Sequence, residues 1–313
     1  MQTRIKSLEK KSPREIWVAS FTSNWIKANT SKEIIKQMLG KMEKVSSYNP
    51  DIICLPENFA KTKSSKPLSE KAEEVGGAIT KPFIKFAKSH KCYIICPLLT
   101  KKDNRFYNST ILIDREGNIM GQYDKIHPTE GECDTGITPG NSPPPVFETD
   151  FAKIGIQICF DINWPGEWRN LKEQGAEIVF WISAYPGGRK LSGYAWSYQY
   201  YVVGCPRIDP SLIFDISGDL IANSGRAEHY AIAPINLEKV FCEVDFNSTK
   251  IPAIMEKYGR KVIIKRYYNE DWLTVESHSP DLTINQIIQE FDLLPFKDYI
   301  VRADKYQKKF RLL

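Results

Sequence analysis

The sequence predicts an α/β fold, because apolar runs of strand length alternate with segments whose apolar residues recur at helical spacing. The clearest strand-like runs cover residues 16–21, 51–57, 153–160 and 177–183. Helical spacing is clearest at Ile34, Ile35, Met38, Leu39, Met42 and Val45. With 313 residues, of which 42% are hydrophobic, the chain can bury a sizeable core.

In the N-terminal half, the first strand (16–21) precedes a helix whose start is marked by a capping box, Thr30-Ser31-Lys32-Glu33. The run 51–57 is continuously apolar up to its last residues, as in strands buried on both faces. A polar loop (58–66) leads into a second helix that ends near His90. Three strands follow at 92–100, 106–114 and 119–125, with a turn at 115–118.

In the second half, residues 131–145 are rich in glycine and proline and predict a loop. A strand (153–160), a helix (164–174), a strand (177–183) and a short aromatic helix (194–201) continue the alternation. Further strands are expected at 201–204, 212–215 and 231–236, with a hairpin turn at 217–219. We therefore expect a basic N-terminal segment (1–14), one main domain (15–250) and a C-terminal extension (251–313) that packs on the domain or on a neighbouring subunit.

Charge and cysteine content exclude several classes of protein. The 43 basic and 38 acidic residues are interspersed, and the densest basic clusters lie at the chain ends, so we expect no nucleic-acid partner. The seven cysteines include no Cys-x-x-Cys pair and the four histidines stand alone, which predicts neither a metal site nor a disulfide framework. The first residues are charged, and no apolar run approaches the roughly 20 residues of a membrane span. We expect a cytoplasmic protein without a membrane segment.

Three reactive side chains stand at the ends of predicted strands. Glu57 ends 51–57, Lys125 ends 119–125, and Cys159 lies at the end of an apolar run before a Pro-Gly turn. A carboxylate, an ammonium and a thiol at one end of a sheet form a set suited to acyl transfer, with base, oxyanion stabiliser and nucleophile. Each residue also has an ordinary interpretation: a core cysteine, a surface ion pair or an edge charge. Amide dipoles of a following helix would favour the thiolate form of Cys159.

The order and surroundings of these residues resemble the nitrilase superfamily of carbon–nitrogen hydrolases. The similar blocks are Leu55-Pro56-Glu57, Tyr123-Asp124-Lys125-Ile126-His127 and Ile158-Cys159-Phe160-Asp161. Pro139-Gly140 and residues 174–178 are also similar, and the resemblance extends from about Ile16 to Phe246.

The resemblance implies a four-layer αββα sandwich, with two mixed β-sheets flanked by helices, that packs on a second subunit in a homo-oligomer. It also implies catalysis through a cysteine thioester, without a metal or organic cofactor. The family uses a second glutamate after the lysine. Glu132 is preferred here over Glu130, because it lies nearer the Pro-Gly turn. Expected to line the substrate cavity are Phe160, Asn163, Trp164, Tyr185 and Trp196.

Cys159-Phe160-Asp161 is similar to the amidase and carbamoylase branches, whereas nitrilases carry Cys-Trp-Glu. We therefore expect an enzyme that hydrolyses a small linear amide or N-carbamoyl compound. Two alternatives stay open: a nitrile-hydrolysing enzyme, and a catalytically silent member that serves as a binding or assembly module. Cysteine proteases of the papain type are disfavoured, because Cys159 lacks their local signature.

Overall fold

The computed structural model describes residues 12–61 and 67–311, and its chain divides into two compact units. Among the described residues, the first unit comprises 17–235 and the second comprises 12–16 and 236–311. The domain boundaries expected from the sequence, and the packing of the segment 251–313, stay predictions.

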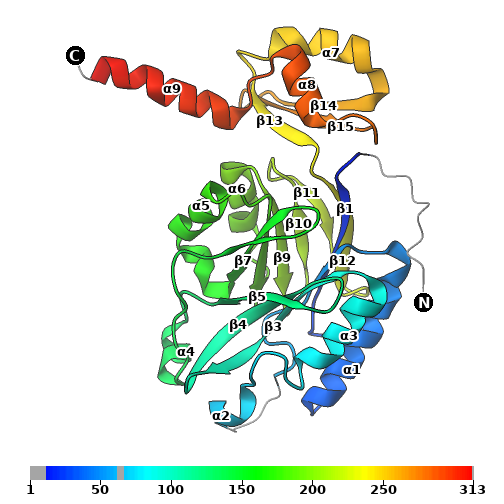
Figure 1. The fold of residues 1–313 in the computed structure, drawn as a ribbon, viewed down its shortest axis with the longest axis vertical. Helices are drawn as coiled ribbons and strands as arrows, with labels where there is room; N and C mark the ends of the chain where they lie inside the picture. Colours follow the sequence, from blue (N-terminus) through cyan, green and yellow to red (C-terminus); the bar gives the residue numbers. More distant parts are fainter. Residues whose placement is uncertain (1–11, 62–66, 312–313) are drawn as a thin grey trace. The chain divides into compact units, whose positions relative to one another are not determined.

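The first unit contains two six-stranded mixed sheets (Figure 1). One has the order β12 (Tyr230–Asn236), β1 (Glu15–Phe21), β2 (Ile52–Cys54), β3 (Tyr93–Lys102), β4 (Arg105–Ile113) and β5 (Ile119–Asp124). The other has the order β11 (Leu220–Asn223), β10 (Leu212–Phe214), β9 (Tyr201–Pro206), β8 (Ile178–Ser183), β7 (Lys153–Ile158) and β6 (Val146–Glu148). The central strands β1–β3 and β7–β9 pair in parallel. The strands β4, β5, β6, β10 and β11 pair antiparallel with their neighbours.

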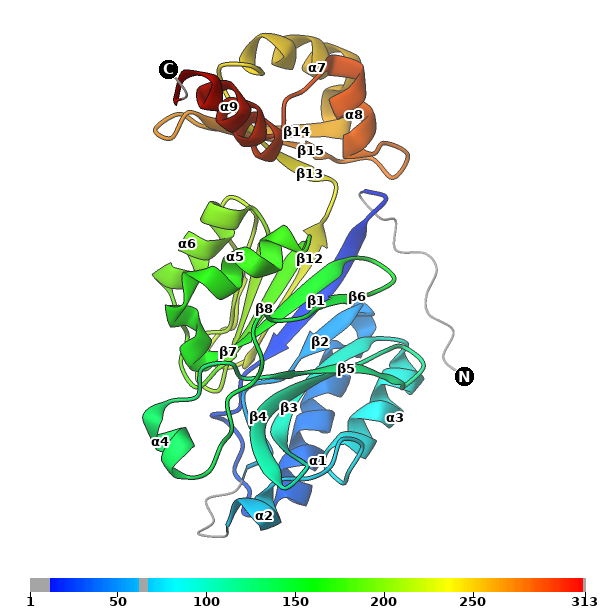
Figure 2. The same ribbon diagram turned by 60° about the vertical axis from the view of Figure 1, so that its left-hand side comes forward.

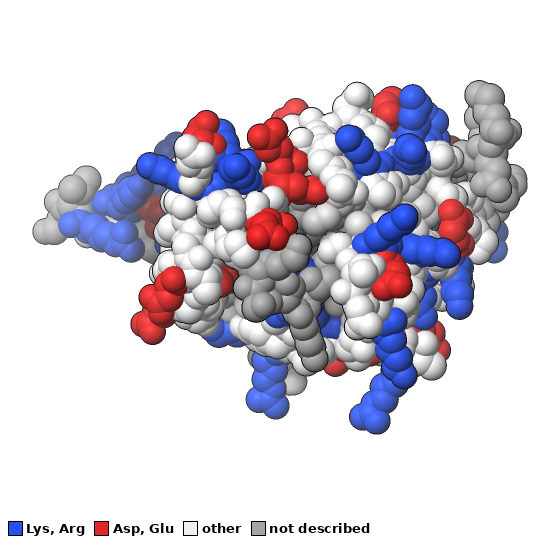
Figure 3. Space-filling view, turned by 90° about the horizontal axis from the view of Figure 1, so that it is seen from below, with Lys and Arg blue, Asp and Glu red and all other residues white. Residues whose placement is uncertain are grey.

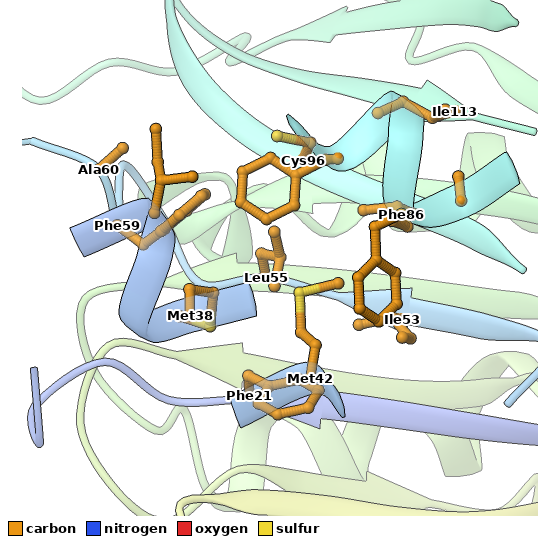
Figure 4. Packing of buried hydrophobic residues seen from close by; sticks show 14 of the residues in the cluster. Phe21, Met38, Met42, Ile53, Leu55, Phe59, Ala60, Phe86, Cys96 and Ile113 are labelled. Atoms are coloured by element: carbon orange, nitrogen blue, oxygen red, sulfur yellow. The ribbon is translucent and has the colours of Figure 1, made fainter. Parts of the chain in front are cut away.

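Helices cover the outer face of each sheet. The helices α1 (Ser31–Met42) and α3 (Thr80–His90) pack on the first sheet through a core cluster that includes Phe21, Met38, Met42, Ile53 and Phe86 (Figure 4). The helices α5 (Pro165–Glu173) and α6 (Arg189–Tyr198) cover the second sheet (Figure 2) through a second cluster that contains Trp168, Trp181 and Leu191.

The inner faces of the two sheets meet each other. Cys205 on β9 donates its thiol hydrogen bond to the carbonyl oxygens of Phe21 and Cys54, each at 3.2 Å. Gln157 on β7 reaches the Tyr123 hydroxyl on β5 at 3.3 Å. The four-layer αββα sandwich is therefore confirmed.

Several predicted elements differ in extent from the observed ones. The capping box at Thr30 is present as predicted. The predicted strand 51–57 ends at Cys54, however, because the chain turns away after Leu55. The Gly/Pro-rich loop contains a short helix, α4 (Glu130–Asp134), and the predicted helix 194–201 begins earlier, at Arg189. Other short helices are α2 (Leu68–Lys71) and the 3-10 turns Glu43–Tyr48 and Cys159–Asn163.

The second unit folds around its own sheet, in the order β13 (Lys239–Glu243), β15 (Trp272–Ser277) and β14 (Val262–Tyr267). The helices α7 (Ile251–Tyr258) and α8 (Ile284–Phe291) bury a cluster against it that contains Cys242, Ile254, Leu273 and Ile287. Two 3-10 turns, Ser248–Lys250 and Gly259–Lys261, flank α7, and α9 (Phe296–Arg311) is the last described helix. The sequence pattern did not reveal this sheet.

Surface charge follows the expectation from composition. On the face drawn in Figure 3, lysine and arginine side chains are interspersed with aspartate and glutamate. Basic residues form no single patch on that face.

Candidate active site

Glu57 comes three residues after Cys54, the last residue of β2. The backbone N–H of Leu55 still donates to the Ile95 carbonyl at 3.1 Å, and a turn follows in which the Phe59 N–H donates to Pro56. Within this turn Asn58 has a φ of 45°, a left-handed conformation that asparagine tolerates better than most residues. The turn leaves Glu57 buried, with 5% of its surface exposed.

Lys125 is the first residue after β5 and is 1% exposed. Its backbone N–H donates to the Asn108 carbonyl and its carbonyl accepts from the Gly140 N–H, both at 2.8 Å. A Cβ atom at Gly140 would lie 2.2 Å from the Asp124 carbonyl oxygen, so only glycine allows this close approach. The Lys125 Nζ lies 2.7 Å from Glu132 Oε2 and 3.6 Å from Glu57 Oε1.

Cys159 follows β7 directly and opens the 3-10 turn Cys159–Asn163. Its φ of 49° is unfavourable for a residue with a Cβ atom, by about 1 kcal/mol, and neighbouring contacts must hold it there. One such contact is the Trp181 indole, whose Nε1–H donates to the Cys159 carbonyl at 3.0 Å. The side chain stays partly exposed, as a nucleophile requires.

The three reactive groups converge, although not from neighbouring strands of one sheet. The strands β2 and β5 belong to the first sheet with β3 and β4 between them, and β7 belongs to the second sheet. Convergence therefore depends on the packing of the two sheets as well as on the shared direction of their strands. Strand alternation in a sequence does not predict this arrangement.

Electrostatics at the site favour a neutral thiol and a charged lysine. Burial raises the pKa of the Cys159 thiol, the Glu57 charge raises it further, and Lys125 opposes both. For Lys125, burial lowers the pKa, but the charges of Glu57 and Cys159 and the hydrogen bond to Glu132 raise it more. The helix α5 begins only at Pro165, so Cys159 does not adjoin the helix whose amides were expected to favour the thiolate, and the net shift of its pKa is upward. The thiol keeps its proton at neutral pH and needs a base.

Of the two candidate supporting glutamates, the structure brings Glu132 to Lys125, whereas Glu130 is exposed to solvent. Glu132 belongs to a capping box with Thr129, whose backbone N–H donates to Glu132 Oε2 at 2.8 Å. Burial raises the pKa of Glu132, but hydrogen bonds from Lys125, Thr129 and Asn108 and the Lys125 charge lower it more. Glu132 is therefore a carboxylate at neutral pH.

Asn108 on β4 connects the two carboxylates and was not identified from the sequence. Its Nδ2 donates to Glu57 Oε1 and to Glu132 Oε1, each at 2.8 Å, and its Oδ1 accepts from Asn58 Nδ2 at 3.2 Å. The side chain is 1% exposed. The signal in the sequence is the polar run Asn108-Ser109-Thr110 within an otherwise apolar strand, since buried polar groups require partners.

Asp161, two residues after Cys159, links the lysine segment to the cysteine turn. Its Oδ2 accepts from the Tyr123 hydroxyl at 2.6 Å and from the Ile158 N–H at 2.9 Å, and its Oδ1 accepts from the His127 N–H at 2.8 Å. These donors flank Lys125 on both sides and precede Cys159. The carboxylate is fully buried and fixes the two segments relative to each other.

Aromatic residues predicted to line the cavity lie around the cysteine turn. Phe160 and Trp164 are exposed and meet edge to face at 5.2 Å, while Trp164 stacks on His127 at 3.8 Å. Burial raises the pKa of Tyr185, and the Cys159 charge raises it further. The Tyr185 hydroxyl is therefore within electrostatic range of Cys159.

The remaining predicted lining residues stand in different positions. Asn163 is exposed, donates to the Phe160 carbonyl at 3.1 Å and accepts from Lys190 Nζ at 2.6 Å. Trp196 lies on α6 beside the turn at Gly218. A role in substrate binding stays a prediction for all five lining residues.

The described part of the chain contains neither a metal-binding cluster nor a membrane-spanning helix. No group of three or more histidine, cysteine, aspartate or glutamate side chains is arranged to hold a metal ion among residues 12–61 and 67–311. No helix in the same ranges has the length and apolar content to cross a membrane. All seven cysteines are free thiols.

Comparison with known proteins shows extensive similarity. The sequence model of the carbon–nitrogen hydrolase family matches residues 17–240. The chain is 29% identical to 2-oxoglutaramate amidase of Bacillus subtilis over 71% of its length and 92% of that protein. It is 35% identical to β-ureidopropionase of Arabidopsis thaliana over 47% of its length and 38% of that protein.

Among solved structures, Saccharomyces cerevisiae Nit3, a member of branch 10 of the nitrilase superfamily, superposes with a TM-score of 0.63. That match covers 72% of this chain and 92% of Nit3, at 19% sequence identity. At this identity the superposition establishes the fold alone.

Proposed function

The chain belongs to the carbon–nitrogen hydrolase family of the nitrilase superfamily, and on that premise we propose that it hydrolyses small linear amides or N-carbamoyl compounds through a thioester on Cys159. One observation carries the proposal: the Lys125 ammonium is buried between Glu57 and Glu132, within electrostatic range of the Cys159 thiol. A buried ammonium held by two carboxylates beside a neutral thiol suits the formation of an oxyanion.

In the first half-reaction, the Glu57 carboxylate takes the Cys159 proton as the sulfur attacks the amide carbon. The base is needed because the pKa of this thiol is raised. The C–S bond forms, the carbonyl electron pair moves to oxygen, and the Lys125 ammonium stabilises the resulting oxyanion. Glu57 then returns the proton to the nitrogen, the C–N bond breaks, and ammonia or an amine leaves.

The second half-reaction regenerates the enzyme. Water attacks the thioester carbon and gives a proton to Glu57. The attack moves the carbonyl electron pair to oxygen and so forms a second oxyanion beside Lys125. The C–S bond breaks, the sulfur regains a proton from Glu57, and the carboxylic acid product leaves. Glu132 holds the Lys125 ammonium in place through both steps, at 2.7 Å.

The preference for an amide or a carbamoyl group is supported by Cys159-Phe160-Asp161 and by the activities named for the matched amidase and ureidopropionase. We further propose that the protein acts in the cytoplasm as a homo-oligomer, with a dimer as its smallest form. Light scattering of the purified protein tests the oligomer, and a mass corresponding to one chain would contradict it.

The decisive experiment measures ammonia release from a panel of linear amides, N-carbamoyl amino acids and nitriles. We expect release from at least one amide or carbamoyl compound and its loss in Cys159→Ala. Cys133→Ala is the matched control, because Cys133 is an exposed cysteine and should leave the activity intact. Release that persists in Cys159→Ala, or release from nitriles alone, would refute the proposal.

A further inference from the structure

We propose that Asn108 is a positioning residue that orients Glu57 for proton transfer by bridging it to Glu132. The bridge is a single carboxamide nitrogen that donates to Glu57 Oε1 and Glu132 Oε1, each at 2.8 Å. This inference rests on the proposed function, in which Glu57 carries the proton between sulfur and nitrogen.

Charge gives the first reason for the bridge. Because the two carboxylate oxygens each lie 2.8 Å from one nitrogen, they are at most about 5.6 Å apart. Carboxylates this close repel each other, and the site has the Lys125 ammonium to offset them. The two N–H bonds of the Asn108 amide place a donor on each carboxylate at once, which offsets part of this repulsion.

Directionality gives the second reason. Glu57 Oε1 receives the Asn108 amide and is also the oxygen nearest to Lys125 Nζ, at 3.6 Å. The other oxygen of Glu57, Oε2, then exchanges the proton with the sulfur and with the leaving nitrogen. Without the amide, the carboxylate of Glu57 could rotate and present either oxygen, so that fewer of its orientations would be productive.

The orientation of the Asn108 amide is itself fixed. Asn58 Nδ2 donates to Asn108 Oδ1 at 3.2 Å, and the flipped amide would place two N–H donors against each other. The backbone carbonyl of Asn108 accepts from the Lys125 N–H at 2.8 Å, which ties the same residue to the lysine. Asn108 therefore contacts the base, the supporting carboxylate and the oxyanion stabiliser.

The test compares Asn108→Leu and Asn108→Asp with Thr110→Val in steady-state ammonia release as a function of pH. Thr110 lies on the same strand, is fully buried, and its hydroxyl has no hydrogen-bond partner among the described residues, so its replacement controls for general damage to β4. We expect kcat to fall about 10- to 100-fold in Asn108→Leu, with little change in KM.

The pH profile separates positioning from a merely structural role. In Asn108→Asp the new carboxyl has no donor while ionised but regains one when protonated, so its activity relative to wild type should rise as pH falls. In Asn108→Leu the acidic limb should move to higher pH, because the amide contributes to the lowered pKa of Glu132. Activities equal to that of Thr110→Val, or ratios to wild type that are independent of pH, would overturn the proposal.

Asn58→Gly provides a second variant in case the Asn108 variants do not fold. Glycine suits the left-handed φ at this position and removes only the amide that orients Asn108. Asn58→Gly should lower kcat, as Asn108→Leu does. An unchanged kcat would count against the proposed orientation of the Asn108 amide.

If wild-type protein releases ammonia from no compound, the proposed function fails, and crystal structures then decide the inference on Asn108. A displaced Glu57 carboxylate in Asn108→Leu, with Thr110→Val unchanged, would support it. Glu57 and Glu132 carboxylates in their original positions would refute it.

Discussion

The buried carboxyl group of Asp161 should make folding stability depend on pH, and Asp161→Asn should remove this dependence. Burial raises the pKa of Asp161 from 3.8 to about 6, and hydrogen bonds from Tyr123, Ile158 and His127 oppose the rise only in part. The folded protein therefore holds a proton at pH values at which the unfolded chain has released it. Stability from this proton is fully present below pH 3.8 and is lost as pH rises through about 6.

The magnitude follows from the interval between the two pKa values. An interval from 3.8 to about 6 corresponds to about 3 kcal/mol of unfolding free energy, at about 1.4 kcal/mol for each tenfold change in an equilibrium constant. Asparagine does not titrate. The unfolding free energy of the wild type minus that of Asp161→Asn should therefore fall by about 3 kcal/mol between about pH 4 and pH 7.

Urea denaturation followed by tryptophan fluorescence, at several pH values, measures this difference. Asp114→Asn is the control, because burial raises the pKa of Asp114 but hydrogen bonds from Asn118 and neighbouring backbone N–H groups lower it more. Its contribution to stability is lost as pH falls, so its pH dependence has the opposite sign. A difference for Asp161→Asn that is flat with pH, or that has the sign of the control, would refute the reasoning.

Three further replacements test other contacts. Gly140→Ala should sharply lower ammonia release, because its Cβ would lie 2.2 Å from the Asp124 carbonyl oxygen beside Lys125. Gly166→Ala is the control: its Cβ would meet nothing within 4 Å, so ammonia release should not change. Glu132→Gln should lower kcat and move the alkaline limb of the pH profile to lower pH, because Glu132 helps to raise the pKa of Lys125; an unchanged limb would contradict this. Arg115→Met should lower the unfolding free energy measured by urea denaturation by about 3–5 kcal/mol, because it removes the buried ion pair between Arg115 and Asp51 at 2.9 Å. A loss no larger than that for a surface pair such as Lys153–Glu148 would contradict this.

The sequence predicted those features that depend on local patterns. Strand-like runs and the capping box at Thr30 are local, and the structure confirms them. The helix α4 could have been predicted in the same way, since Thr129-Glu130-Gly131-Glu132 is also a capping box. The glycine and proline content of the surrounding loop obscured that signal.

Features that depend on tertiary structure were not accessible. The role of Asn108 arises from pairing of β4 with β5, which places the residue beside a lysine and two glutamates from other segments. The raised pKa of the Cys159 thiol follows from burial and from Glu57, which lies about a hundred residues earlier in the sequence. The local pattern, a strand followed by a helix, predicted instead that the pKa of the Cys159 thiol would be lowered.

The capping box of α4 restricts how this part of the chain can be lengthened or shortened. Glu132 Oε2 accepts from the backbone N–H of Thr129, the N-cap of the helix, and from Nζ of Lys125, the proposed oxyanion stabiliser. One oxygen thus joins the start of a helix to the position of an ammonium. Insertions or deletions between Lys125 and Thr129 would displace Glu132 from Lys125, and those between Thr129 and Glu132 would also break the capping box. Changes of length after Asp134 would leave the oxygen in place. Loop variation that alters specificity without loss of activity should therefore be confined to the segment after α4.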